Sequence, residues 1–203
     1  MSSILIQAWT VHKSGDEYYL TYTHWIYLKE IVKYYDNICL LSPIKIHKSL
    51  IKEEMVPINF FTNVTVKELP YSNSYISAVK YFFKYLSAYK NLNKFDVSYA
   101  RYPIPFGWLQ KIYMKKSKRI IHFVGDPINT IKKNPNLSSL KKLFLIFFFM
   151  PEFLMYMWAC KKAAVYTNGF HIKKKLRKYG VEAMPVISST LKADDFYFDA
   201  LKK

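Results

Sequence analysis

A short apolar run that ends at a glycine and an aspartate is the part of this chain best suited to position a ligand. The run spans residues 120–124, follows basic residues, and leads directly into Gly125, Asp126 and Pro127. An apolar run bounded by turn residues predicts a strand buried on both faces, as in parallel sheets. In open α/β sheets, ligands bind beyond the carboxyl ends of the strands. We therefore expect Gly125 and Asp126 to lie at a binding or catalytic site.

A second candidate site follows the first predicted strand, residues 4–9. Ser14 and Glu17 have the spacing of a helix capping box and precede an amphipathic helical pattern. A helix that begins directly after a strand presents free backbone N–H groups and the positive end of its dipole to an anion. A single glycine does not make a GxGxxG pattern. Two interpretations stay open, an anion site at Gly15 and Asp16 or an ordinary helix cap.

The two cysteines do not indicate a metal site or a disulfide. Cys39 and Cys160 lie in apolar runs, without CxxC or histidine spacing, which favours buried thiols in a reducing compartment. The N-terminus lacks the basic region and the long apolar run of a signal peptide. No carboxylate cluster suits a metal ion. We expect a cytoplasmic protein with no bound metal.

Composition predicts one globular domain with an anionic partner. The chain has 203 residues, of which 51% are hydrophobic, enough for a sizeable core. Its formal net charge of +17 implies attraction to nucleic acid, a membrane surface or a phosphorylated substrate. Because Lys, Ile, Tyr, Asn and Phe are all abundant, part of this charge can reflect a skewed overall composition.

Strand and helix patterns alternate along the whole chain. The expected strands are residues 4–9, 37–44, extended segments within 58–69, 96–102, 119–124, 163–167 and 185–190. Expected helices follow the Ser14 cap, run from about 72–74 to 90, start after Pro105, and span 170–179 up to Gly180. This alternation predicts an α/β domain with a parallel sheet, right-handed crossovers and helices on both faces.

Residues 143–160 form a nearly continuous apolar segment that Pro151 and Glu152 interrupt. Three interpretations stay open: a helix buried in the protein, a helix whose outer face enters a membrane interface, and a membrane span. The central proline and carboxylate argue against a span, although the length is near the lower limit for one. Apolar aromatics beside lysines are typical of a monotopic surface on anionic lipid. The membrane-contact residues that we expect are Lys141, Lys142, Phe147, Phe148, Phe149, Lys161 and Lys162.

Several short motifs, in order, carry a family resemblance. They are Arg101-Tyr-Pro103 after a strand, Val124-Gly-Asp-Pro127, Val165-Tyr-Thr-Asn-Gly169 before a helix, and Val186-Ile-Ser-Ser-Thr190 followed by Asp194-Asp-Phe196. Together they resemble the N-terminal domain of family 4-like glycosyltransferases of the GT-B fold, especially those of bacterial surface polysaccharide synthesis. The resemblance covers essentially the whole chain.

This resemblance implies a Rossmann-like three-layer domain over residues 1–190, with a mainly parallel sheet and helices on both faces. Residues 191–203 would begin an interdomain linker, and the C-terminal donor domain would be absent, because no Glu-x7-Glu pair is found. The implied function is acceptor binding in the transfer of a sugar from a nucleotide sugar to a membrane-associated, lipid-linked glycan. The family usually acts with retention and without an essential metal or a tightly bound cofactor. The missing domain, in cis or as a separate chain, would be needed for transfer.

The resemblance also implies a set of cleft residues. Asp126 would accept hydrogen bonds from sugar hydroxyls, and Arg101 would bind a phosphate or position Asp126. The alternatives are an aspartate that caps a turn before Pro127 and an arginine solvated on the rim. His122 is interpreted as a packed histidine. The full set of cleft candidates is Gly15, Asp16, Arg101, Gly125, Asp126, Asn168, Ser188 and Ser189.

Two other function classes remain from the composition. A basic nucleic-acid-binding module would use the charge and the tyrosines, but the chain has no RNA-recognition, zinc-knuckle or helix-turn-helix pattern. A non-catalytic scaffold in a membrane complex would use the apolar segment. We expect a peripheral protein on the inner face of the cell membrane, with a glycan acceptor rather than nucleic acid as its partner.

Overall fold

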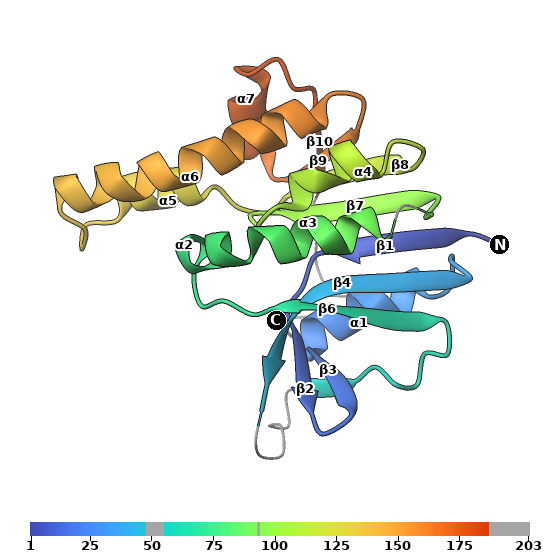
Figure 1. Ribbon diagram of the computed structural model, residues 1–203. Helices are drawn as coiled ribbons and strands as arrows, with labels where there is room; N and C mark the ends of the chain where they lie inside the picture. The colour runs from blue at the N-terminus through green and yellow to red at the C-terminus, as the bar shows by residue number, and fades with distance from the viewer. Residues whose placement is uncertain (48–54, 93, 187–203) are drawn as a thin grey trace, which may run out of the picture.

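The computed structural model describes residues 1–47, 55–92 and 94–186, which form an α/β fold around a ten-stranded mixed sheet (Figure 1). The strands are β1 (Ser3–Gln7), β2 (Val11–Ser14), β3 (Glu17–Thr21), β4 (Asn37–Ile46), β5 (Met55–Pro57), β6 (Val64–Pro70), β7 (Val97–Tyr102), β8 (Lys118–Phe123), β9 (Ala164–Asn168) and β10 (Met184–Val186). The helices are α1 (Tyr22–Ile31), α2 (Tyr75–Ala78), η1 (Val79–Tyr81), α3 (Phe82–Lys90), η2 (Gly107–Leu109), α4 (Gln110–Tyr113), α5 (Pro127–Lys133), α6 (Ser139–Cys160) and α7 (Phe170–Arg177).

The strand order reverses direction beside β1. On one side of β1 the sheet continues with β4 and then β6. On the other side it continues with β7, β8, β9 and β10 in turn. All of these pairings are parallel, as the alternation of strands and helices predicts. The antiparallel part is an extension in which β3 pairs with both β2 and β5. The prediction of a parallel sheet is therefore correct for the centre and wrong for this extension.

The predicted helix after Ser14 begins later than expected, because β2 and β3 form a β-hairpin there. Ser14 pairs with Glu17 across a two-residue loop, in which Gly15 has a φ of 57°. Glycine at the first central position provides the positive φ that such hairpin loops need. The capping-box interpretation of Ser14 and Glu17 is wrong, and α1 begins only at Tyr22. No helix N-terminus is therefore presented at this loop.

Other predicted boundaries are close to those observed. Ser74 caps α2 through a capping box with Ser77, and Gly180, with a φ of 71°, follows α7. Of the extended segments predicted within 58–69, only the part from Val64 onward is a strand, since β5 ends at Pro57 and β6 begins at Val64. Of the predicted strand 185–190, residues 187–190 lie outside the described residues, and so does the predicted linker 191–203.

The two faces of the sheet carry two separate cores. On one face, α1 packs in a cluster that contains Ile6, Leu28 and Leu40. On the other, the cluster draws on α3, α4, α6 and α7, with Tyr156 at its centre. Helices on both faces were predicted, but the cover is uneven. The alternate residues that β7, β8 and β9 direct toward the α1 side are at most partly buried.

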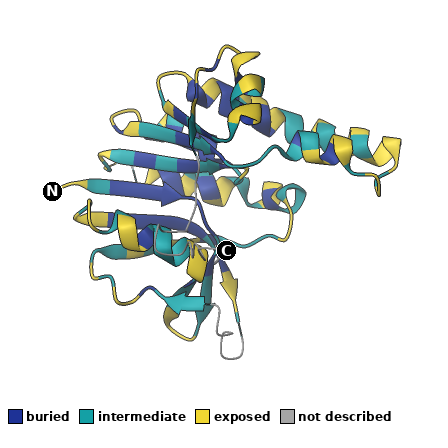
Figure 2. Ribbon diagram, turned by 180° about the vertical axis from the view of Figure 1, so that it is seen from behind, coloured by how far each residue is buried: buried dark blue, intermediate teal, exposed yellow. Residues whose placement is uncertain are grey.

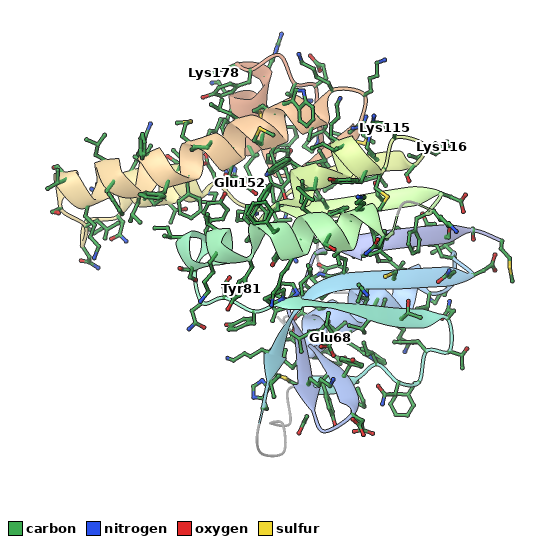
Figure 3. All side chains as sticks on the ribbon, viewed as in Figure 1. Glu68, Tyr81, Lys115, Lys116, Glu152 and Lys178 are labelled. Atoms are coloured by element: carbon green, nitrogen blue, oxygen red, sulfur yellow. The ribbon has the colours of Figure 1, made fainter. Side chains whose placement is uncertain are left out.

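The 22-residue helix α6 extends well beyond the sheet, with α5 beside its outer half (Figures 1 and 2). Its second half is held by Glu152, which accepts hydrogen bonds from the Phe106 backbone N–H (2.7 Å), the Trp108 indole N–H (2.8 Å) and the Tyr75 hydroxyl (2.7 Å). Figure 3 places Glu152 on the side of α6 that faces the domain. Among the described helices, α6 alone is long and apolar enough to cross a membrane, judged by length and composition only.

Candidate functional site

A cleft of about 310 Å³ lies on the α1 side of the sheet, where the strand order reverses between β1 and β7. We refer to it as the Arg101 cleft. Aromatic and aliphatic side chains form most of its wall, and the polar groups are few, as in small-molecule sites. The lining residues are Ile4, Trp9, Tyr27, Ile31, Tyr35, Tyr99, Arg101, His122 and Val124.

Strand alternation places the polar residues of this cleft. In β7, Tyr102 points into the core under α6 and Ala100 lies buried beside Gly107 on the same side, so Tyr99 and Arg101 point to the α1 side. The parallel register pairs Arg101 with His122 on β8, which brings their side chains to the same face. Leu28 of α1 packs with Ile6 of β1 and Leu40 of β4, and α1 has few contacts with β7, so the face of β7 and β8 is left partly uncovered.

His122 is held by a hydrogen bond at each ring nitrogen. Its Nδ1 lies 2.8 Å from the Tyr99 hydroxyl, and its Nε2 lies 2.8 Å from Oδ1 of Asn168. Donation from Nε2–H to the amide oxygen leaves Nδ1 to accept from Tyr99, so the neutral imidazole satisfies both partners. Burial lowers the pKa of His122, the Asn168 hydrogen bond opposes this shift, and the charge of Arg101 adds to it. The side chain is therefore fixed and uncharged at neutral pH.

Arg101 contacts a second neutral histidine rather than a carboxylate. Its Nη1 lies 3.4 Å from Nε2 of His24, whose ring stacks on Trp9 with centroids 5.5 Å apart. Burial lowers the pKa of His24 to about 4, and the charges of Arg101 and His12 act in the same direction. In the part of the chain that the structure describes, no carboxylate forms an ion pair with Arg101. The guanidinium thus keeps donors for an anionic ligand.

Asp126 lies outside the Arg101 cleft. Its carboxylate accepts a hydrogen bond from the Asn129 N–H as the N-cap of α5 and forms an ion pair with Lys175 at 2.5 Å. Asp126, Asn129 and Lys175 line a separate pocket of about 150 Å³. The proposed partnership of Arg101 with Asp126 is not found, since each has another partner. The alternative of an aspartate that caps the turn at Pro127 describes its observed position.

We expect Asp126→Ala to lower the free energy of unfolding by about 2 kcal/mol, because both a helix cap and a partly buried ion pair are lost. Asp126→Asn should cost about half as much, since asparagine caps a helix as well as aspartate but carries no charge. Urea denaturation of both variants measures this difference. Equal losses would mean that the cap contributes nothing. Ligand binding in the Arg101 cleft should be unchanged in Asp126→Asn.

The remaining predicted cleft residues are dispersed. Gly15 and Asp16 are exposed at the tip of the β2–β3 hairpin and are absent from the lining of the Arg101 cleft. Gly125 directly follows the cleft residue Val124, and Asn168 supports the cleft through His122. Ser188 and Ser189 lie outside the described residues.

The predicted membrane-contact residues divide between surface and core. Phe147 is exposed, whereas Phe149 packs into the domain, stacked on Tyr75 with ring centroids 4.9 Å apart. Phe148 is half-buried between Phe144 and Phe147. Lys141, Lys161 and Lys162 are exposed and Lys142 is half-buried.

Several cleft residues were not among the predicted site residues, namely Trp9, Tyr27, Tyr35, Tyr99 and His122, and neither was His24, which contacts Arg101. His122 is packed, as interpreted from the sequence, but it also lines the cleft. The period-two alternation in residues 97–101 and 120–124 was a usable signal, because it gives Tyr99, Arg101 and His122 a common face once the strands pair. Among the described residues, no group of three or more His, Cys, Asp or Glu side chains could hold a metal ion.

No family model, curated protein or solved structure matches this chain. The interpretation of the Arg101 cleft therefore depends on its position and its chemistry.

Proposed function

We propose that this chain is the acceptor-binding half of a GT-B glycosyltransferase, and that the Arg101 cleft receives the phosphate-bearing part of a lipid-linked sugar. The observation that carries the proposal is Arg101, a cation without a carboxylate partner among the described residues, placed between aromatic rings at the strand reversal. In doubly wound sheets, ligands bind at this reversal, outside the carboxyl ends of the strands.

The strand order supports the finer fold assignment. Numbered along the central parallel strands, β6-β4-β1-β7-β8-β9 has the order 3-2-1-4-5-6 of a Rossmann-like domain. The hairpin β2–β3 is then an insertion after the first strand of that order, and the short β5 is an insertion after the second. A Rossmann-like domain is what the motif resemblance implies for the acceptor half of a GT-B enzyme.

The chemistry of the cleft fits a sugar pyrophosphate. Trp9 and Tyr99 line the cleft with aromatic surface suited to the C–H groups of a sugar ring, while Arg101 can form paired hydrogen bonds to phosphate oxygens. During transfer, the bond from the anomeric carbon to the donor phosphate oxygen breaks and a bond to an acceptor hydroxyl oxygen forms, with loss of the hydroxyl proton. We propose that a second domain holds the nucleotide sugar, and that this chain orients the acceptor.

Titration calorimetry tests this assignment on the 203-residue chain. The probes are a sugar linked by pyrophosphate to a short alkyl chain and the same alkyl sugar without phosphate. The pyrophosphate compound should bind, and Arg101→Ala should weaken its binding at least about tenfold, because hydrogen bonds to charged groups contribute about 1.5 to 3 kcal/mol. The matched control is Arg177→Ala, which removes an exposed arginine of α7.

Two results would contradict the proposal. One is equal affinity for the two probes, which would mean that the phosphates are not recognised. The other is an equal effect of Arg101→Ala and Arg177→Ala, which would assign the binding to general positive charge rather than to the cleft.

A further inference from the structure

We propose that α6 is a membrane-docking helix that lies flat in the interface of an anionic bilayer, held there by an apolar stripe along its outer face. This inference is independent of the Arg101 cleft and of the reaction proposed for it. Of the three predicted membrane-contact phenylalanines, it keeps Phe147 and replaces Phe148 and Phe149 with other residues of α6. The stripe consists of Leu140, Leu143, Phe144, Phe147, Pro151, Leu154 and Trp158, all exposed.

The stripe is continuous and faces away from the core. At 3.6 residues per turn, its members fall within an arc of roughly 100° and extend about 27 Å along the helix. The opposite side of α6 contains Phe153, Tyr156 and Cys160, which are buried against the sheet. A helix that packs on a sheet needs only one apolar face. The second apolar face is exposed, on a helix that projects from the domain (Figure 2).

Basic side chains near both ends of the stripe suit an anionic lipid surface. Lys141 lies near the first end and Lys161 near the last, where Nζ of Lys111 also lies 5.4 Å from the ring centroid of Trp158. Glu152 is the only carboxylate in the sequence between residues 127 and 181, and it is buried. Tryptophan and lysine together are typical of interfacial segments, where rings sit at headgroup depth and ammonium groups reach the phosphates.

The same charges argue against a second copy as the occupant. Two stripes packed face to face would bring the lysines of one helix against the lysines of the other in either orientation, without acidic residues to offset them. A membrane span is also disfavoured. The contacts of Glu152, and the hydrogen bond from the Tyr156 hydroxyl to the Ile104 carbonyl (2.7 Å), fix the second half of α6 to the domain.

Vesicle co-sedimentation provides the test, with phosphatidylcholine alone and with phosphatidylcholine mixed with phosphatidylglycerol. The unmodified chain should sediment with the anionic vesicles and remain largely in solution with the neutral ones. Leu143→Ser with Phe147→Ser should lower the partition coefficient at least about tenfold, because two exposed apolar side chains leave the lipid. The matched control is Tyr34→Ser with Phe60→Ser. Its side chains, both 73% exposed, are comparable to Leu143 (67%) and Phe147 (72%) and lie away from α6.

The charge contribution has its own pair of variants. Lys141→Gln with Lys161→Gln, the two exposed lysines near the ends of the stripe, should weaken anionic binding about 25-fold, since each lysine near the surface contributes a factor of about five. Lys29→Gln with Lys33→Gln removes two exposed lysines, one in α1 and one in the turn that follows it, on the other face of the sheet, and should have little effect. Added salt should reduce binding to the anionic vesicles.

A measurement on the unmodified chain excludes misfolding as an explanation. Lipids brominated in their acyl chains should quench the fluorescence of the unmodified chain, and Trp158→Phe should remove most of that quenching. Equal recovery with and without anionic vesicles would overturn the proposal. So would equal behaviour of the stripe and control variants. If the stripe variant instead converted a dimer to a monomer in sedimentation velocity, without any effect of vesicles, the occupant would be a second copy and the proposal would be wrong.

Discussion

Replacing Glu152 with alanine is expected to lower the free energy of unfolding by about 3 to 5 kcal/mol. The reason is that two buried donors, on Phe106 and Trp108, and the partly buried hydroxyl of Tyr75 would each lose their acceptor. Unsatisfied buried donors cost about 1 to 3 kcal/mol each, and water entering the vacated space recovers part of this. Glu152→Gln keeps one acceptor oxygen and should cost less. Urea denaturation measures both, with the exposed Glu182→Gln as the control.

The same side chain should give the domain a specific pH dependence. Burial raises the pKa of Glu152 to about 7, although its three hydrogen-bond donors favour the carboxylate and limit the shift. Between about pH 4.5 and 7, the folded state therefore keeps a proton that the unfolded chain releases. Stability should fall by about 3 kcal/mol as pH rises through this range and change little above it. In Glu152→Gln this contribution should vanish. If the unfolding free energy of Glu152→Gln depended on pH as that of the unmodified chain does, the pH dependence would arise from other groups.

Glu152 also links the two surfaces to which functions are proposed. Its donors Phe106 and Trp108 follow β7, the strand that carries Arg101 into the cleft, while Glu152 belongs to α6, which carries the docking stripe. A carboxylate in an apolar helix is costly in lipid and in a protein core alike, unless it is fully hydrogen-bonded. Its position in the middle of the apolar segment, which argued against a membrane span, is explained by these bonds.

The sequence predicted individual strands and helices better than it predicted which strands pair with each other. Local apolar runs with turn residues at their ends identified β1, β4, β7, β8 and β9 to within a few residues. The segment after Ser14 was missed because S-x-x-E suits both a capping box and a hairpin with a glycine loop. The choice between them depends on contacts far along the chain, where β2 pairs with β4 and β3 with β5. No local pattern records those contacts.

The candidate site was predicted only in part, for the same reason. Asp126 was placed correctly at the end of a strand, yet its carboxylate is engaged by Lys175, which is 49 residues further along the chain. Arg101 was identified from a motif, whereas the cleft around it depends on the register of β7 with β8 and on the place where α1 packs. Trp9 and Tyr35 line it only because the sheet brings separate segments together.

Gly107→Ala is expected to destabilise the domain by about 2 to 3 kcal/mol through overpacking. A β-carbon at Gly107 would collide with the hydroxyl of Tyr156 and would lie 3.0 Å from Cβ of Ala100. Tyr156 cannot easily move, because it is fully buried, packs edge-on against Tyr102 and donates to the Ile104 carbonyl. The control is Gly125→Ala, since a β-carbon there would have no atom within 4 Å.

A double-mutant cycle isolates the collision from other effects. Tyr156→Phe alone should cost about 1 kcal/mol, the typical value of one hydrogen bond, while it removes the oxygen that the new β-carbon meets. Gly107→Ala combined with Tyr156→Phe should therefore be more stable than the sum of the single losses predicts, by about 1 to 2 kcal/mol. Denaturation of the four proteins in urea gives this coupling. If the losses in unfolding free energy of the two single variants simply added, the backbone of η2 would have moved away from α6 to accommodate the methyl group. The contact between Gly107 and Tyr156 would then not fix α6 against β7.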